Sequence, residues 1–325
     1  MRTLLRVLLI GILAVATLAC ERRDSRVPLI SFLQFMETPS TQRAREGLVK
    51  HLEASGMVQG VDFETEVRSA NGDLSTLRIM AEKIRDSGAK VVVPLSGAAL
   101  RAANDSIKNK PIVFVLVDDP MDAGVVEPDG DKRPNVTGVT RDYAFGRIFD
   151  YAQRIMPDAK VYGTLYDPSD PSSDRLLQAC RVRARQKGLE WQEVPVNGAG
   201  ETASATNALM TRGVDLIIQV PSDFATAGFD GMLRVANRNR IPIMGSQVSL
   251  AERGAVLAVG IESTAYGQQA GRLVERILRG EDPADLPIET PTAKPEFLLN
   301  FGAAQRLGLQ VPSSIVDETD RTISF

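Results

Sequence analysis

From Val27 onward, short apolar runs alternate with longer segments whose apolar residues recur every three or four positions. The short runs predict strands, and the longer segments predict amphipathic helices. Val91–Leu95 has no polar alternation, as expected for a strand that is covered on both faces. Repeated alternation of this kind is typical of βαβ units that build a parallel sheet. In the first half, the predicted strands are 27–35, 61–67, 91–95, 111–117 and 136–139.

A second series of the same kind begins near residue 140. It resembles the first in detail: the pairs Asn71/Asn197 and Ser96/Ser222 lie in similar local sequence and share an offset of 126 residues. A duplicated α/β half predicts two similar lobes, with a ligand-binding cleft between them. The predicted strands are 160–166, 189–194, 215–220 and 241–245, and the predicted helices are 143–156, 174–187, 202–210 and 225–237.

A further strand, 256–261, and a helix, 265–278, follow the second series. A simple tandem pair of domains would not need them. They fit an α/β architecture in which the chain passes between two lobes more than once. We predict crossings near residues 139, 246 and 290, which together form a three-strand hinge. The first lobe then consists of 27–139 and 247–289, and the second of 140–246 and 290–325.

The first twenty residues differ from the rest of the chain. Arg2 and Arg6 flank the start of an apolar stretch, 4–18, that is short for a membrane span and typical of an export signal. Cys20 directly follows Ala19, as in a bacterial lipobox. We predict a signal peptide at 1–19, lipidation of Cys20 and a tether at 20–26. The protein would then be exported and anchored to a membrane, facing the periplasm or the cell surface. Plain cleavage after Ala19, or an uncleaved anchor, is the alternative.

Composition excludes several classes of protein. The 325 residues are 43% hydrophobic and 24% charged, which is ordinary for a globular protein. A net charge of −3, without a Lys/Arg-rich run, argues against a nucleic-acid partner. Cys180 is the other cysteine, and its apolar neighbours at helical spacing predict a small buried residue rather than a metal ligand. We expect a monomer.

Candidate chemistry follows the predicted strands, because ligands of open parallel sheets bind beyond the carboxyl ends of the strands. Ser96 and Gly97 begin a helix, where a hydroxyl and free N–H groups suit an anion. Asp223 holds the matching place in the second lobe and would accept a ligand ammonium group. Ordinary helix capping explains Ser96 and Asp223 equally well. The candidate ligand-binding residues are Met36, Glu37, Ser96, Gly97, Asp118, Asp119, Tyr166, Ser169, Asp170, Ser172, Asp223, Phe224, Gln247 and Glu262.

Catalysis finds little support in the sequence. The single histidine, His51, lies inside a predicted helix, far from any strand end. The sequence has no Gly-x-Ser-x-Gly motif, no phosphate-binding loop and no His/Cys set with metal-ligand spacing. We therefore expect a binding protein that is not an enzyme and that needs no cofactor or metal.

Several segments are similar to those of a known family. The most specific are FVLVDDP at 114–120 and NVTGV at 135–139, and others lie at 166–170, 240–243 and 267–271. With them, the chain resembles the ABC-transporter substrate-binding lipoproteins that include tryptophan- and tyrosine-binding members, a branch of the type I periplasmic binding proteins. The resemblance implies two Rossmann-like lobes with parallel sheets, a three-strand hinge, and closure on a small-molecule ligand. It also implies an ABC permease in the membrane as the partner.

The chain departs from that family where the ligand is expected. Asp167 and Pro171 replace two asparagines, Phe224 replaces a third, and Glu262 begins a segment that is usually Asp-Tyr-Tyr. The ligand therefore need not be the aromatic amino acid of better-known members. We hypothesise a solute-binding protein of an ABC importer, with an amino acid or a related aromatic or carboxylate compound as ligand. A receptor that presents its closed form to a membrane sensor kinase is the alternative.

Overall fold

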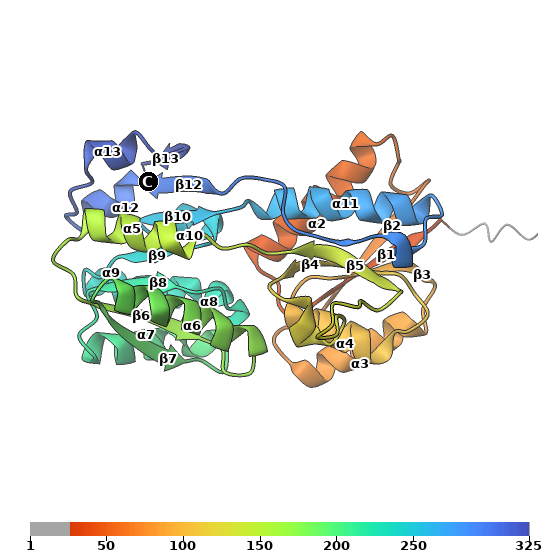
Figure 1. Cartoon of the computed structure of the whole chain (residues 1–325), viewed down its shortest axis with the longest axis horizontal. Helices are drawn as coiled ribbons and strands as arrows, with labels where there is room; N and C mark the ends of the chain where they lie inside the picture. Colours follow the sequence, from red (N-terminus) through yellow and green to blue (C-terminus); the bar gives the residue numbers. More distant parts are fainter. Residues whose placement is uncertain (1–26, 325) are drawn as a thin grey trace, which may run out of the picture.

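The computed structural model describes residues 27–324, which form two α/β lobes side by side (Figure 1). The predicted signal peptide, the predicted lipidation site Cys20 and the whole predicted tether, 20–26, lie outside the described residues. No helix within 27–324 is long and apolar enough to cross a membrane.

The first lobe is built on a parallel sheet in the order β11-β5-β4-β3-β1-β2. Its central strand β4 is fully buried, since helices cover both faces of the sheet (Figure 1). Helices α2 (Pro39–Ala54) and α11 (Ser263–Leu278) cover one face, and α3 (Leu74–Arg85) and α4 (Gly97–Ser106) cover the other. The strands are β1 (Leu29–Gln34), β2 (Glu64–Ser69), β3 (Ala89–Pro94), β4 (Ile112–Val117), β5 (Val136–Thr140) and β11 (Ile288–Glu289).

Glycines let α2 and α11 pack with their backbones in contact. A Cβ atom at Gly267 would lie 1.9 Å from the carbonyl oxygen of Ala44, and one at Gly47 would lie 2.2 Å from that of Thr264. Any larger residue would push the helices apart. This packing is the physical reason for the Gly-Gln-Gln-Ala-Gly segment that carries part of the family resemblance.

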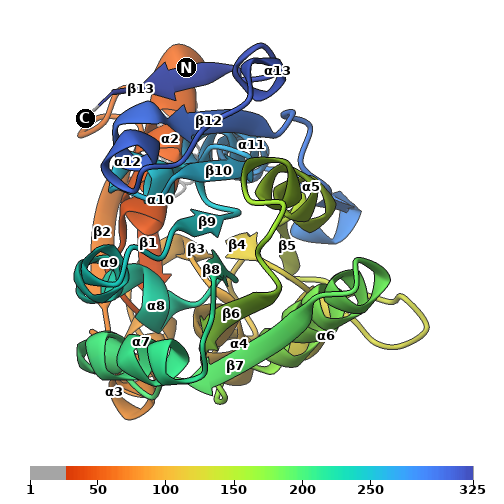
Figure 2. The same ribbon diagram turned by 90° about the vertical axis from the view of Figure 1, so that its left-hand side faces the viewer.

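The second lobe has a sheet in the order β13-β12-β10-β9-β8-β6-β7, parallel except where β10 pairs with β12. Figure 2 shows α5 and α6 on one face, and α7 and α9 on the other. The strands are β6 (Val161–Tyr166), β7 (Glu190–Pro195), β8 (Leu216–Gln219), β9 (Ile243–Gly245), β10 (Leu257–Gly260), β12 (Glu296–Asn300) and β13 (Arg321–Ile323). The helices are α5 (Phe145–Ile155), α6 (Pro171–Gln186), α7 (Thr202–Thr211), α8 (Asp223–Ala227), α9 (Phe229–Arg238), α10 (Val248–Glu252), α12 (Phe301–Arg306) and α13 (Ser313–Val316).

The chain passes between the lobes at 141–144, 261–262 and 290–295. We expected the second crossing near 246, with 247–289 in the first lobe. The structure differs, because β10 is buried between β9 and β12 in the second sheet and α10 packs beside it. Residues 247–260 therefore belong to the second lobe, and the chain returns to the first lobe where α11 begins.

One predicted helix is two. The segment 225–237 was expected to be continuous, but α8 ends before Gly228 and α9 begins after it. Gly228 lies so close to the preceding loop that a Cβ atom would be 2.3 Å from the carbonyl oxygen of Ala199. The break leaves α8 as a short helix whose first residue is Asp223.

Candidate ligand-binding site

A cavity of about 1010 Å³, its open mouth included, lies between the two lobes. The strand ends of the first lobe form one wall, and the loops that follow β6 and β8 form the other. Eight of the sequence-predicted residues line it together: Ser96, Gly97, Asp118, Asp119, Ser169, Asp170, Ser172 and Asp223.

The duplicated strand ends face this cavity from opposite lobes. Ser96 caps α4 and Ser222 caps α8 in the same way, each hydroxyl accepting the N–H three residues further on, at 3.2 and 3.3 Å. A Cβ atom at Gly97 would meet no atom within 4 Å, so a ligand can approach the start of α4 closely. The N-terminal end of this helix favours a negatively charged group.

Asp223 is an acidic group without a partner. Its carboxylate forms no hydrogen bond or ion pair with any residue in 27–324. Burial raises its pKa to about 7, and the nearby carboxylates of Asp170, Asp118 and Asp167 add to the shift, while Arg141 opposes it. A cation from a ligand would relieve this unfavourable environment.

Arg141 is the most consequential of the lining residues that sequence reasoning missed; the others include Leu77, Arg78, Arg101 and Asp122. Arg141 lies in the first crossing, where its N–H donates to the carbonyl oxygen of Val117 at 2.8 Å. Its guanidinium donates to the Tyr143 hydroxyl at 3.2 Å and lies 3.9 Å from Asp118. Burial disfavours the charge, but Tyr143 and Asp118 hold the pKa of Arg141 above its ordinary value. The cavity therefore contains a fixed positive charge beside its carboxylates.

Contacts across the mouth hold the lobes together. Arg175 on α6 pairs with Asp119 at 3.0 Å and with Asp122 at 2.7 Å, both in the first lobe. Deeper in, the rings of Phe35 and Phe224 meet with centroids 5.5 Å apart. These contacts join residues of opposite lobes, so the described arrangement is a closed one.

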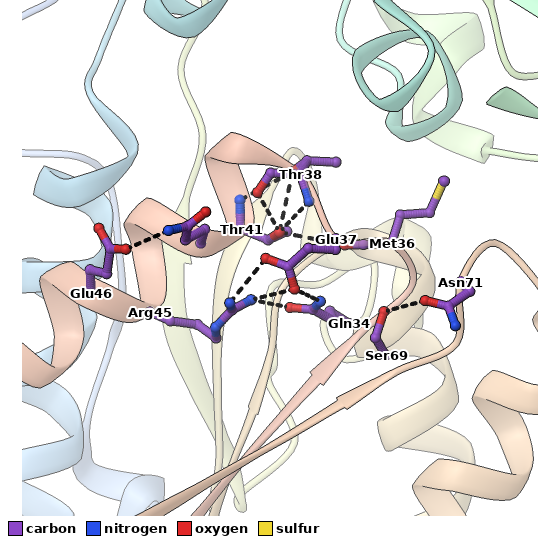
Figure 3. Close-up of polar contacts among 10 residues, drawn as sticks. Gln34, Met36, Glu37, Thr38, Thr41, Arg45, Glu46, Ser69 and Asn71 are labelled. Carbon is purple, nitrogen blue, oxygen red and sulfur yellow. Dashed lines mark hydrogen bonds and ion pairs between the residues drawn. The ribbon is translucent and has the colours of Figure 1, made fainter.

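Six predicted residues do not line this cavity. Glu37 pairs with Arg45 at 3.0 Å and accepts from Gln34, which ties β1 to α2 (Figure 3). Met36 points away from that cluster (Figure 3) and lies near the Gly72 turn. The other four are Tyr166, which packs in the core of the second lobe, Phe224, which is buried against Phe35, and Gln247 and Glu262, which line a separate cavity.

The sequence signal was therefore incomplete at two places. Their position at strand ends identified Ser96 and Asp223. That position did not reveal which of the other strand-end side chains point into the cavity. Arg141 follows β5, where a basic residue directly after a predicted hinge strand could have been noticed. The pairing of Glu37 with Arg45, eight residues further along the chain, required the folded structure.

Two α/β lobes, three crossings and a polar cavity between the lobes define a type I periplasmic binding protein. The chain belongs to the ABC transporter substrate binding protein family, whose sequence model matches residues 29–323. It is accordingly a substrate-binding protein of an ABC transporter, with a binding role rather than an enzymatic one.

Several known proteins are similar to the chain over most of its length. A tyrosine-binding protein of Clostridioides difficile is 26% identical over 282 residues, which are 86% of this chain and 81% of that protein. An ABC domain from Streptococcus pneumoniae, solved with L-Trp, has a TM-score of 0.82 and 26% identity, and covers 90% of this chain and all of its own. A conserved domain protein from Vibrio cholerae has a TM-score of 0.86 and 25% identity, covering 91% of this chain and 100% of that one.

Proposed function

We propose that this protein is the exported, lipid-anchored receptor of an ABC importer and that it binds an amino acid, or a related aromatic or carboxylate compound, by closing its lobes. The observation that carries the proposal is the partnerless Asp223, which faces Ser96 and Arg141 across the interlobe cavity. A monomer would be sufficient for this binding, since one chain supplies both walls of the cavity.

The polarity of the cavity supports a zwitterionic ligand. The ammonium group would pair with Asp223, and the carboxylate would lie against the start of α4 and Arg141. The side chain of the ligand would lie between these two charged contacts, against the apolar surface of Leu77, Val117 and Phe35. The names of the relatives agree with this class of ligand, because one is a tyrosine-binding protein and another was solved with L-Trp.

Closure supports the transport role. A ligand that touches both lobes binds the closed form better than the open one, and this difference in affinity drives the conformational change. The described lobes are in contact through Arg175 and through Phe35 with Phe224. The likeness in shape is also greater to the L-Trp complex, with a TM-score of 0.82, than to a ligand-free, open substrate-binding protein of Clostridium difficile, at 0.67.

Thermal unfolding in the presence of each of the twenty amino acids, followed by calorimetry on those that stabilise the protein, tests the proposal. We expect saturable binding of at least one amino acid. Its decarboxylated amine and its deaminated acid should each bind much more weakly, because each lacks one of the two charged contacts. Binding that is equally tight without the ammonium group, or no stabilisation by any compound, would contradict the proposed ligand class.

Replacing Arg175 with glutamine should weaken amino-acid binding about fivefold. The two ion pairs of Arg175 join the lobes only in the closed form, and exposed ion pairs contribute up to about 1 kcal/mol. Arg154→Gln is the matched control, since its ion pair with Glu318 at 2.8 Å lies within the second lobe. Calorimetry should show unchanged affinity for the control variant. Equal affinities for the wild type and Arg175→Gln would mean that this contact does not favour closure.

A further inference from the structure

A second, smaller cavity lies on the other side of Arg141. It has a volume of about 360 Å³, its opening included. Its walls come from α2 and α11 of the first lobe, from the β9–α10 loop and the first turn of α10 in the second, and from two of the three crossings. This hinge cavity exists only where the two lobes meet, and Arg141 lines both it and the ligand cavity.

Two buried hydroxyl groups in the hinge cavity lack partners. Ser246 and Ser249 are 4% and 5% exposed, and neither Oγ atom has a hydrogen-bond partner among the described residues. A buried polar group without a partner is costly, so native structures seldom retain one without a reason. Two such groups on one small wall point to a bound species.

The hinge cavity contains both carboxylates and hydrogen-bond donors. Each carboxylate has a donor of its own: Glu262 pairs with Arg43 at 3.3 Å, and Asp142 accepts from the N–H of Tyr143 at 2.8 Å. The side-chain oxygen of Gln247 accepts from Thr226 at 3.0 Å, which leaves its amide N–H groups as donors. The remaining capacity, with the guanidinium of Arg141, suits an acceptor that carries a negative charge.

We propose that the hinge cavity binds a small monovalent anion, of the size of formate or a halide, through Ser246, Ser249 and Arg141. The anion would join the second lobe, which carries both serines, to the first crossing, which carries Arg141. Anion binding in the hinge cavity does not depend on the proposed function.

Formate and bromide are the probes for the test. The unfolding temperature of the ligand-free wild-type protein should rise saturably with sodium formate, by about 2 °C at tenfold excess over the dissociation constant. The double variant Ser246→Ala/Ser249→Ala should lose this rise while folding normally, because it removes only hydroxyl groups without protein partners. In crystals soaked in bromide, the anomalous signal should lie within hydrogen-bond distance of both Oγ atoms.

Ser173→Ala is the matched control. Ser173 also has a buried hydroxyl without a partner among residues 27–324, but it lines neither of the two cavities, so this variant should keep the full response to formate. A formate response that persists in the double variant would overturn the proposal, since it would place the anion elsewhere, as at the start of α4. The absence of any saturable response in the wild type, with no bromide signal in the hinge cavity, would overturn it as well. Either result leaves amino-acid binding by the ligand cavity unaffected.

Discussion

Replacing Asp223 with asparagine should weaken amino-acid binding about a hundredfold or more, while the ligand-free protein stays folded. The substitution keeps the shape of the side chain and removes its charge. Losing one partner of a buried ion pair costs about 3–5 kcal/mol, which corresponds to a factor of a hundred to a few thousand in affinity. The fold should tolerate the change, since Ser222 rather than Asp223 caps α8. Calorimetry with the amino acid that binds the wild-type protein measures the effect.

Glu37→Gln is the control for this prediction. Glu37 was a sequence-level candidate with the same type of charge, but its carboxylate pairs with Arg45 outside the ligand cavity. Its substitution should leave the affinity within about twofold of the wild type. Unchanged affinity in Asp223→Asn, or a large loss in Glu37→Gln, would mean that the ammonium group is bound elsewhere.

The comparison of these two acids shows how far the sequence predicts the site. Topology alone brings the carboxyl ends of parallel strands to one edge, so the order of strands and helices along the chain is enough to place Ser96 and Asp223 in the cleft. Whether a side chain at such an end turns inward depends on its local partners. Arg45 and Gln34 hold Glu37 away, and nothing in the spacing of residues reveals that competition.

The fold was more accessible to prediction than the site, because hydrophobic periodicity records burial directly. The strongly apolar strands, such as β4, were predicted within a residue or two of their ends. The pattern does not specify which sheet a buried strand joins. The apolar sequence of Leu257–Gly260 is compatible with burial in either sheet. Only the pairing of this strand with β9 and β12 assigns it to the second lobe. Arg141 was missed for a related reason: it directly follows β5, but the sequence pattern indicates a crossing between the lobes at that point rather than a wall of the cavity.

The affinity for the amino acid should fall about tenfold for each pH unit below 7. The pKa of Asp223 in the ligand-free protein is about 7, raised by burial and by Asp170, Asp118 and Asp167. The ligand ammonium group needs the ionised carboxylate, so binding at lower pH must first remove a proton. Calorimetry at pH 6 in two buffers with different ionisation enthalpies should show the release of nearly one proton per ligand bound, and at pH 8.5 almost none.

The stability of the ligand-free protein should change with pH in the opposite direction. An acid whose pKa is raised on folding contributes stability below its unfolded pKa, near 3.8, and that stability is lost as the pH rises through about 7. The unfolding free energy of the wild type, relative to Asp223→Asn, should therefore decline between pH 4 and 8. The pH dependence of affinity and the pH dependence of stability together distinguish Asp223 from the other acids. Only an acid whose ionised form is destabilised in the ligand-free protein, and is stabilised by the ammonium group of the ligand, gives both. Proton uptake on binding, or parallel stability profiles for wild type and variant, would contradict this electrostatic description of the cavity.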